Sequence, residues 1–355
     1  MPYRIVFMFL LSLLIFSCKE EERPQYSATP APLNIPTIFQ ELLSEPLIPE
    51  NNPQTVEGIA LGRSLFYDPI LSADGTQSCA SCHGIQQSFT DSRRFSFGID
   101  GIAGTRNSMP LFNMAWNYTE KFLWDGEANS LEEQVADPII NPIEMHNTWD
   151  NLVASLNASN KYPQLFEAAF GSSDIDQTTI AKAIAQFERT LISANSKFDR
   201  HLLGTATLTP SEASGLEIFM NENKGDCFHC HGNPNSPLWT DNTFHNNGLD
   251  AVFTDRGLGE VTGDPRDFGL FKSPSIRNLA YTAPYMHDGR FNTLDEVINH
   301  YSDGLVYSET IDPLMKTIAQ GGVQLTQDEK NDLKAFLLSL SDPSFRDNPD
   351  FQNPN

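Results

Sequence analysis

Two short cysteine and histidine motifs carry the chemistry that this sequence can perform. They share the pattern Cys-x-x-Cys-His and comprise Cys79, Cys82 and His83 in the first copy and Cys227, Cys230 and His231 in the second. This spacing is typical of c-type haem attachment, in which two thiols bond to the haem edge and the adjacent imidazole binds the iron. Two intact copies therefore predict two covalently bound haem c groups.

Other uses of the cysteine pairs compete with haem attachment. Four cysteines can hold a structural zinc ion, but the pairs of such sites usually lie much closer in sequence than these two. Redox-active dithiols and plain disulfides are further alternatives. Neither of them explains a histidine directly after each cysteine pair.

The composition limits the classes of partner. The chain has 355 residues, with 46 Asp and Glu against 23 Lys and Arg, and a formal net charge of −23. Because nucleic-acid binding needs basic patches, no nucleic-acid partner is expected. The negative charge can steer a basic electron-transfer protein to the surface, or it only keeps an exported protein soluble. The length allows two modest domains, each with its own core.

The N-terminus has the features of a bacterial export signal. Arg4 precedes an apolar run at residues 5–16, which is too short to span a bilayer as a mature helix. The sequence Ile-Phe-Ser-Cys that ends at Cys18 is similar to a lipoprotein box, in which the cysteine is lipidated. We therefore predict a lipoprotein signal peptide at residues 1–18. The mature protein would be periplasmic in a Gram-negative-type cell envelope and held to the membrane only through lipid on Cys18.

Residue patterns predict a mostly α fold with long loops. A Gly-x-x-aliphatic-Phe pattern precedes each haem motif, at residues 62–66 and 215–219, which suggests a duplicated unit. Capping boxes at Thr209 and Thr326 predict the starts of two further helices. Apolar residues at helical spacing over residues 178–202 predict one long helix that joins the two units.

These patterns divide the mature chain into four segments. Residues 19–45 are predicted to form a flexible tether, which is rich in Glu, Pro and Ser up to residue 34. Apolar residues return from about residue 35, with helical patterning up to residue 47. Residues 46–200 would form an N-terminal haem domain and residues 201–342 a C-terminal haem domain. Residues 343–355 are predicted to be a polar tail.

Several stretches outside the haem motifs resemble the bacterial di-haem cytochrome c peroxidase family, which includes peroxidases and MauG-like enzymes. These stretches lie at residues 68–75, 106–108, 122–126, 131–134, 141–145 and 279–289. The similarity extends from about residue 46 to about residue 340. It implies two cytochrome c-like haem domains related by duplication, the first peroxidatic and the second devoted to electron transfer.

The resemblance implies an enzyme that reduces hydrogen peroxide to water. Electrons from a small redox protein, a cytochrome c or a cupredoxin, would enter at the second haem and pass to the first. One alternative is MauG-like oxidation of a protein or organic substrate by high-valent di-haem iron. Another is a di-haem electron carrier without enzymatic activity. The resemblance also allows a homodimer.

The family motifs imply roles for particular residues. His83 and His231 match the proximal iron ligands of the two haems. Glu144 matches a carboxylate that moves a proton above the first haem, and Gln134 matches an amide of the same pocket. Trp124 matches a tryptophan that relays electrons between the haems. A calcium ion between the domains is implied at the positions that match Asn107, Thr282 and Pro284.

The sequence departs from many peroxidases of the family at two iron ligands. Those enzymes rest with a loop histidine on the first haem, but residues 84–123 contain no histidine, and Ile99 occupies the matching position. They place methionine on the distal side of the second haem, where this chain has Tyr301, as do MauG-like members. Tyrosinate would favour the higher oxidation states of iron. His300 and Met286 are competing ligands.

Overall fold

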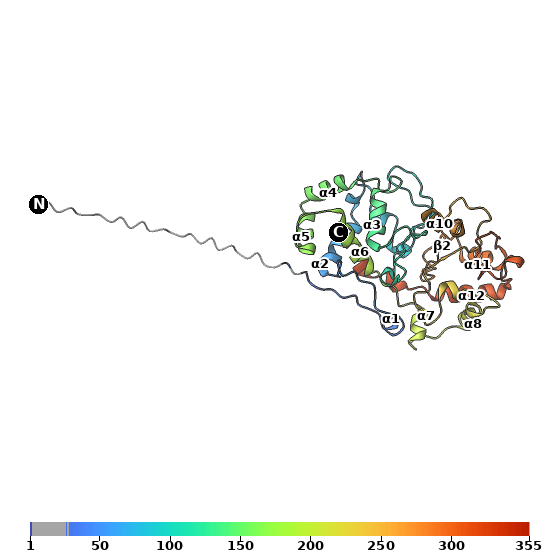
Figure 1. Ribbon diagram of the computed structural model, residues 1–355. Coiled ribbons are helices and arrows are strands. Elements are labelled where there is room, and N and C mark those ends of the chain that lie inside the picture. The colour runs from blue at the N-terminus through green and yellow to red at the C-terminus, as the bar shows by residue number, and fades with distance from the viewer. Residues whose placement is uncertain (2–25, 27, 355) are drawn as a thin grey trace.

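The computed structural model describes residues 1, 26 and 28–354. Residues 2–18 of the predicted signal peptide, with its lipidation site at Cys18, and residues 19–25 and 27 of the predicted tether lie outside the described residues. The described chain folds into two mainly helical lobes that lie side by side (Figure 1). No helix of the described part of the chain is long and apolar enough to cross a membrane.

The first lobe is organised around α2 (Val56–Phe66) and α6 (Gln177–Arg189). Leu61 and Leu65 of α2 and Phe187 of α6 are completely buried where the two helices pack. Gly62 allows this close approach, because a Cβ atom there would lie 1.8 Å from the backbone oxygen of Ala183. Three helices complete the lobe: α3 (Leu131–Ile140), α4 (Trp149–Ala158) and α5 (Tyr162–Phe170).

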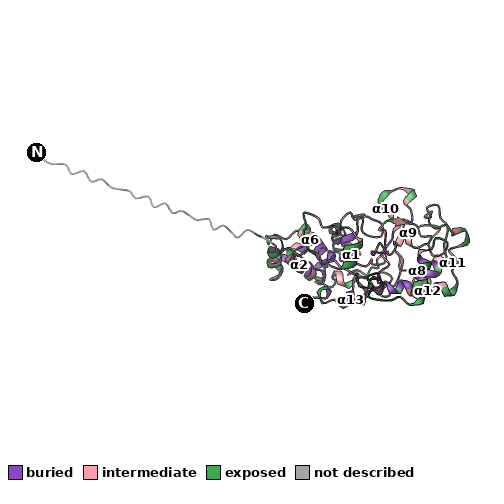
Figure 2. Ribbon diagram, turned by 90° about the horizontal axis from the view of Figure 1, so that it is seen from below, coloured by how far each residue is buried: buried purple, intermediate pink, exposed green. Residues whose placement is uncertain are grey.

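The second lobe repeats this construction with α8 (Pro210–Met220) and α12 (Gln327–Ser339). A Cβ atom on Gly215 would lie 2.0 Å from the backbone oxygen of Asp332, so the glycine of the repeated sequence pattern has the same function in both lobes. The capping boxes predicted at Thr209 and Thr326 are confirmed. The remaining elements are α9 (Phe228–His231), α10 (Leu258–Thr262), α11 (Leu294–Asp303) and the antiparallel strands β1 (Phe244–His245) and β2 (Phe271–Lys272). Buried residues concentrate where α2 packs on α6 and where α8 packs on α12 (Figure 2).

The prediction of a single helix over residues 178–202 is wrong. The structure divides it into α6 and α7 (Lys197–Leu202), separated by an extended linker between the lobes. The physical reason is a second capping box, in which the side chains of Ser196 and Asp199 bond to each other's backbone N–H groups and begin α7 anew.

Both ends of the described chain pack more closely than the sequence suggested. Part of the predicted tether forms α1 (Thr37–Leu42), in agreement with the helical patterning of residues 35–47, and its Phe39 ring packs edge-on against Trp116 at 5.0 Å. The predicted polar tail instead forms α13 (Pro343–Arg346) and a 3₁₀ turn, and its buried Phe345 and Phe351 belong to the core of the first lobe. Burial of these apolar side chains favours the packed arrangement over a solvated tail.

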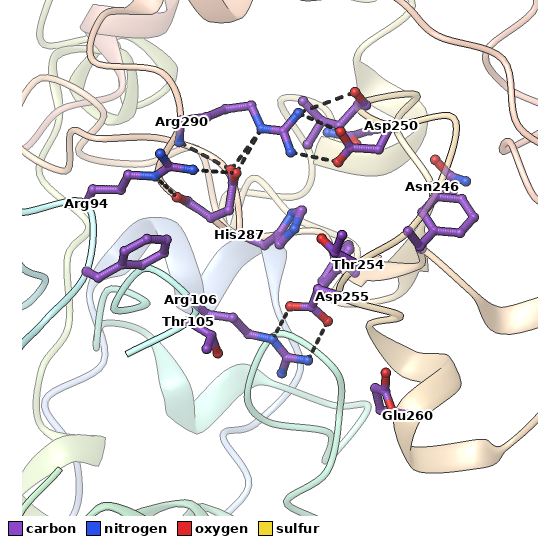
Figure 3. A pocket seen from close by; sticks show the side chains of 17 residues that line it. Arg94, Thr105, Arg106, Asn246, Asp250, Thr254, Asp255, Glu260, His287 and Arg290 are labelled. Carbon is purple, nitrogen blue, oxygen red and sulfur yellow. Dashed lines mark hydrogen bonds and ion pairs between the residues drawn. The ribbon is translucent and has the colours of Figure 1, made fainter. Parts of the chain in front are cut away.

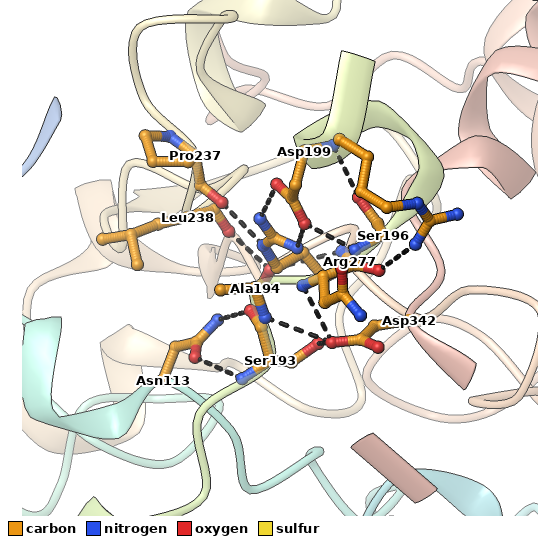
Figure 4. Close-up of polar contacts among 12 residues, drawn as sticks. Asn113, Ser193, Ala194, Ser196, Asp199, Pro237, Leu238, Arg277 and Asp342 are labelled. Carbon is orange, nitrogen blue, oxygen red and sulfur yellow. Dashed lines mark hydrogen bonds and ion pairs between the residues drawn. The ribbon is translucent and has the colours of Figure 1, made fainter. Parts of the chain in front are cut away.

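Buried polar groups fix the linker to both lobes (Figure 4). Asp342 accepts hydrogen bonds from the backbone N–H groups of Ala194 and Asn195, at 3.2 and 3.0 Å. Beside them, Arg277 forms a buried ion pair with Asp199, whose side chains are 0% and 1% exposed. The Arg277 guanidinium also donates to the Pro237 carbonyl at 2.6 Å, so the buried charges are paired and hydrogen-bonded.

Candidate functional site

The first cysteine motif has the local geometry that a covalent haem requires. Cys79 and Cys82 are free thiols, and the described cysteines form no disulfide. His83 Nδ1 lies 2.9 Å from the backbone oxygen of Phe89, to which it donates, so Nε2 is left for an iron. Burial lowers the pKa of His83, which favours the neutral imidazole that binds metal.

The second motif lies in the wall of a largely apolar cavity in the second lobe. Cys227, Cys230 and His231 line this cavity together with Tyr301. His231 Nδ1 lies 3.3 Å from Ser273 Oγ, which again leaves Nε2 open, and burial lowers the pKa of His231 to about 4. Both motifs therefore fit a covalent haem. The two cysteine pairs lie in different lobes, which opposes a shared zinc site.

The three competing distal residues of the second haem are placed differently. Tyr301 and Met286 line the cavity, and the Asn247 side-chain amide reaches both, at 3.1 Å from Tyr301 Oη and 3.6 Å from Met286 Sδ. His300 is buried, and its Nε2 donates to the backbone oxygen of Asn247 at 3.1 Å. This bond occupies Nε2 of His300, and His300 is not among the residues that line the cavity.

Gln134 presents an unsatisfied polar atom within the first lobe. It lies on α3, whose N-terminus is capped by Ser130, and its side chain is buried. Its Oε1 has no hydrogen-bond partner. Buried acceptors are rarely left unpaired, so this oxygen is suited to a donor that enters the site, such as a bound ligand or water.

Glu144 lies in the turn that follows α3. Its Oε1 accepts a hydrogen bond from Asn141 Nδ2 at 3.0 Å. Burial, with the nearby charge of Asp137, raises the pKa of Glu144 to about 7. Burial also raises the pKa of Cys82, and the charge of Glu144 contributes to that rise, so the carboxyl group lies within electrostatic reach of the first haem motif.

The loop that carries Ile99 is pressed against the Glu144 turn. Ile99 N–H donates to the backbone oxygen of Glu144 at 2.9 Å. A Cβ atom on Gly98 would lie 2.2 Å from the backbone oxygen of Ile143, so only glycine permits this contact. The structure thus places an aliphatic residue beside the Glu144 turn.

Trp124 lies between the two lobes. Its Nε1 donates to the backbone oxygen of Asn107 at 2.7 Å, and its own backbone oxygen accepts from Lys272 N at 2.8 Å. Its ring lies edge-on to His287 at 6.5 Å. Trp124 also lines the cavity of the second haem motif.

The three residues matched to a calcium site line the same cavity as Trp124: Asn107, Thr282 and Pro284. The Asn107 side-chain nitrogen donates to the backbone oxygens of Arg93 and Arg94, at 3.1 and 3.2 Å. The oxygen of that amide is therefore the atom left for a cation, which suits the preference of calcium for oxygen ligands.

Two ionisable residues that the sequence analysis missed lie beside the haem motifs. Glu188 of α6 is 2% exposed, its Oε2 has no partner, and burial raises its pKa to about 8. Its charge adds to the effect of burial in raising the pKa of Cys79. Its position four residues after Ile184, on the apolar stripe of α6, is the signal that could have revealed it.

His245 lines the cavity of the second motif and bridges two carboxylates. Its ring nitrogens lie 2.6 Å from Asp312 and 2.8 Å from Asp241. Burial lowers the pKa of His245, but the two carboxylates outweigh that effect and raise it to about 12. The two carboxylates thus favour the charged imidazolium form of His245 beside the second motif.

Comparison with known proteins agrees with this geometry. Residues 56–207 match the family model described as di-haem cytochrome c peroxidase. The chain is 35% identical over 293 residues to the methylamine utilization protein MauG of Methylophilus methylotrophus, covering 82% of this chain and 84% of that protein. It is 32% identical over 318 residues to the cytochrome c551 peroxidase of Nitrosomonas europaea, covering 88% of this chain and 87% of that protein.

A solved structure has the same fold. It is the crystal structure of a MauG-like protein associated with microbial copper homeostasis, with a TM-score of 0.81 and 35% sequence identity, covering 90% of this chain and 98% of that chain. The mostly α fold with two haem domains, predicted from the sequence, is confirmed. The chain belongs to the di-haem cytochrome c peroxidase family, and it is an oxidoreductase.

Proposed function

We propose that this chain reduces hydrogen peroxide to water at a first haem on Cys79 and Cys82, with electrons that a small redox protein delivers to a second haem on Cys227 and Cys230. The proposal rests on two groups: the carboxyl of Glu144, whose pKa is raised to about 7, and the unpartnered amide oxygen of Gln134. Both belong to α3 and the turn that follows it.

The proposed chemistry assigns the proton to Glu144. When bound, the haems supply the electrons that reduce the O–O bond. Cleavage also requires a proton to move from the near oxygen of peroxide to the far one. A carboxylate with a pKa near 7 can accept that proton and return it. Gln134 Oε1 accepts a hydrogen bond from the peroxide and orients it.

We propose Trp124 as the electron relay between the haems. The support is its position between the lobes, where it bonds to Asn107 in one and to Lys272 in the other. A calcium ion bound by oxygens of Asn107, Thr282 and Pro284 would hold this junction. The same proposal assigns residues 46–200 and 201–342 to the two haem domains, and Tyr301 to the distal side of the second haem.

The proposed setting is the cell envelope. The sequence of residues 1–18 supports export and lipid anchoring at Cys18. An acidic chain outside the cytoplasm can attract a basic cytochrome c or cupredoxin as its electron donor.

A cavity between the lobes supports MauG-like oxidation of an organic substrate as a second candidate (Figure 3). It measures about 470 Å³ and is lined by charged side chains of both lobes, including Arg106 and Arg290, and by His287. The His287 ring stacks on Phe271 at 3.6 Å and lies edge-on to Trp124. A substrate in this cavity would therefore be one aromatic side chain away from the proposed electron relay.

Steady-state peroxide reduction tests the proposal. The full chain should contain two haems by the pyridine haemochrome assay and should consume peroxide with reduced cytochrome c as donor. Hydroquinone as the donor tests the second candidate. A chain with two haems that oxidises neither donor with peroxide would be an electron carrier, and the proposal would fail.

A further inference from the structure

Phe89 lies next to the histidine of the first haem motif in a strained backbone conformation. Its carbonyl oxygen is the acceptor for His83 Nδ1 at 2.9 Å. Its φ is 62°, in the left-handed region that bulky side chains disfavour. Such a conformation persists only where surrounding contacts hold it. Backbone hydrogen bonds hold this residue, from Phe89 N–H to the Gly84 oxygen at 2.8 Å and from Leu111 N–H to the Phe89 oxygen at 3.2 Å. The direction of the Phe89 carbonyl, and with it the hydrogen bond to His83, depends on these bonds together with what packs around the Phe89 ring.

The C-terminal segment supplies much of that packing. Phe345 and Phe351 meet the Phe89 ring edge-on, with ring centroids 5.7 and 6.5 Å away, and contact each other at 5.3 Å. Both rings are nearly inaccessible, at 2% and 6% exposure. They reach this place from the second lobe, because the segment follows directly after α12.

Polar contacts hold the segment along its length. At its start, Asp342 caps α13 and accepts hydrogen bonds from the linker between the lobes (Figure 4). Further along, Arg346 Nη2 donates to Oε1 of Gln86 at 2.9 Å, and Gln86 lies three residues after His83. At its end, Arg63 of α2 donates to the backbone oxygens of Pro349 and Gln352, at 2.6 and 2.8 Å.

We propose that residues 342–352 act as a strap through which the second lobe positions the proximal ligand of the first haem, with Phe345 and Phe351 as positioning residues. The proposal rests on the proposed function only in taking His83 as an iron ligand. A hydrogen bond from the outer nitrogen makes a ligating imidazole more basic and fixes its orientation. Loss of the two rings lets Phe89 leave its strained conformation, which weakens that bond. Weaker donation from His83 favours the reduced iron.

Phe345→Ala and Phe351→Ala in the full chain test the strap. Redox titration of the haem absorption bands should show an upward shift in the potential of the first haem and no shift for the second. Resonance Raman spectra of the reduced protein should show a lower iron–histidine stretching frequency at the first haem. Phe345→Leu and Phe351→Leu, which largely keep the buried volume, should give smaller shifts in the same direction and serve where an alanine variant does not fold.

Phe166→Ala is the matched control. Phe166 is completely buried in the same core and contacts Phe170, and Phe89 is not among its ring neighbours. This variant should lower the melting temperature without moving either potential. The strap is refuted if the folded strap variants keep the first potential, or if Phe166→Ala moves it equally. Haem content, measured separately, shows whether haem is attached at the first motif. Failure of the proposed function can therefore be distinguished from failure of the strap.

Discussion

The carboxyl group of Glu144 can be protonated or ionised near neutral pH. Its pKa is raised to about 7, first by burial and then by the charge of Asp137. A general acid–base group works best when its pKa lies near the working pH. We expect Glu144→Gln to lower peroxide turnover by about a hundredfold or more, the usual range for such a group, with both haems still attached. Steady-state assays with haem quantification check this, and Glu133→Gln, on the exposed face of α3, is the control.

The pH profile should identify the same residue. Glu144 must be ionised to accept a proton, so wild-type turnover should fall as the pH decreases through about 7. Asp137→Asn removes a negative charge that raises this pKa, so the acidic limb should move to lower pH. Rate measurements between pH 5 and 9 check the shift. An unmoved limb in Asp137→Asn would mean that another group controls it.

Tyr301 and His300 can be separated by spectroscopy. Tyr301 Oη lies in the cavity of the second motif, whereas His300 Nε2 is bonded to the backbone oxygen of Asn247. Tyr301→Phe should therefore keep the haem content but change the electron paramagnetic resonance signal of the second haem. If Tyr301→Phe has the wild-type spectrum and His300→Ala has a changed one, His300 is the ligand.

At the scale of elements, α6 combines core packing with a buried carboxyl group. The pKa of Glu188 is raised by burial from 4.5 to about 8, so its neutral form is favoured in the folded state. The stability that this neutral form contributes is fully present below about pH 4.5 and is lost as the pH rises through about 8. Ionisation of Glu188 should therefore weaken the fold in alkaline solution.

Glu188→Gln tests this linkage, because glutamine has nearly the same shape and no charge. At pH 9 the variant should have a higher melting temperature than the wild type. This difference between the two proteins should be smaller at pH 5. Calorimetry at the two pH values measures the difference. Glu167→Gln on the exposed face of α5 should show no such pH dependence. A pH-independent difference for Glu188→Gln would contradict the assignment.

At the scale of the whole molecule, the first site carries no loop histidine that could block it. Residues 84–123 contain none, and His146, the next along the chain, has its Nδ1 2.6 Å from exposed Asp100. We therefore expect the fully oxidised protein to react with peroxide without prior reduction of the second haem. Stopped-flow mixing of the ferric protein with peroxide measures this. A requirement for pre-reduction would show that another residue occupies the first iron in the resting state.

The sequence by itself determined the features that depend on neighbouring residues. Each Cys-x-x-Cys-His motif lies within five residues, and the capping boxes at Thr209 and Thr326 link residues three apart, so their geometry follows from local chain conformation. The Gly-x-x-aliphatic-Phe repeat also identified the glycines that allow helices to pack in both lobes. These local signals sufficed for the helical class and for the family.

Only the tertiary structure decided the features that depend on distant segments. The tail at residues 343–355 looked polar because most of its side chains are polar, but Phe345 and Phe351 are buried in the core of the first lobe. Likewise, Glu188 and His245 acquire shifted pKa values from opposite causes: burial without a partner for the first, and two carboxylates for the second. Desolvation and pairing depend on which segments the fold brings together, and composition and spacing do not encode that.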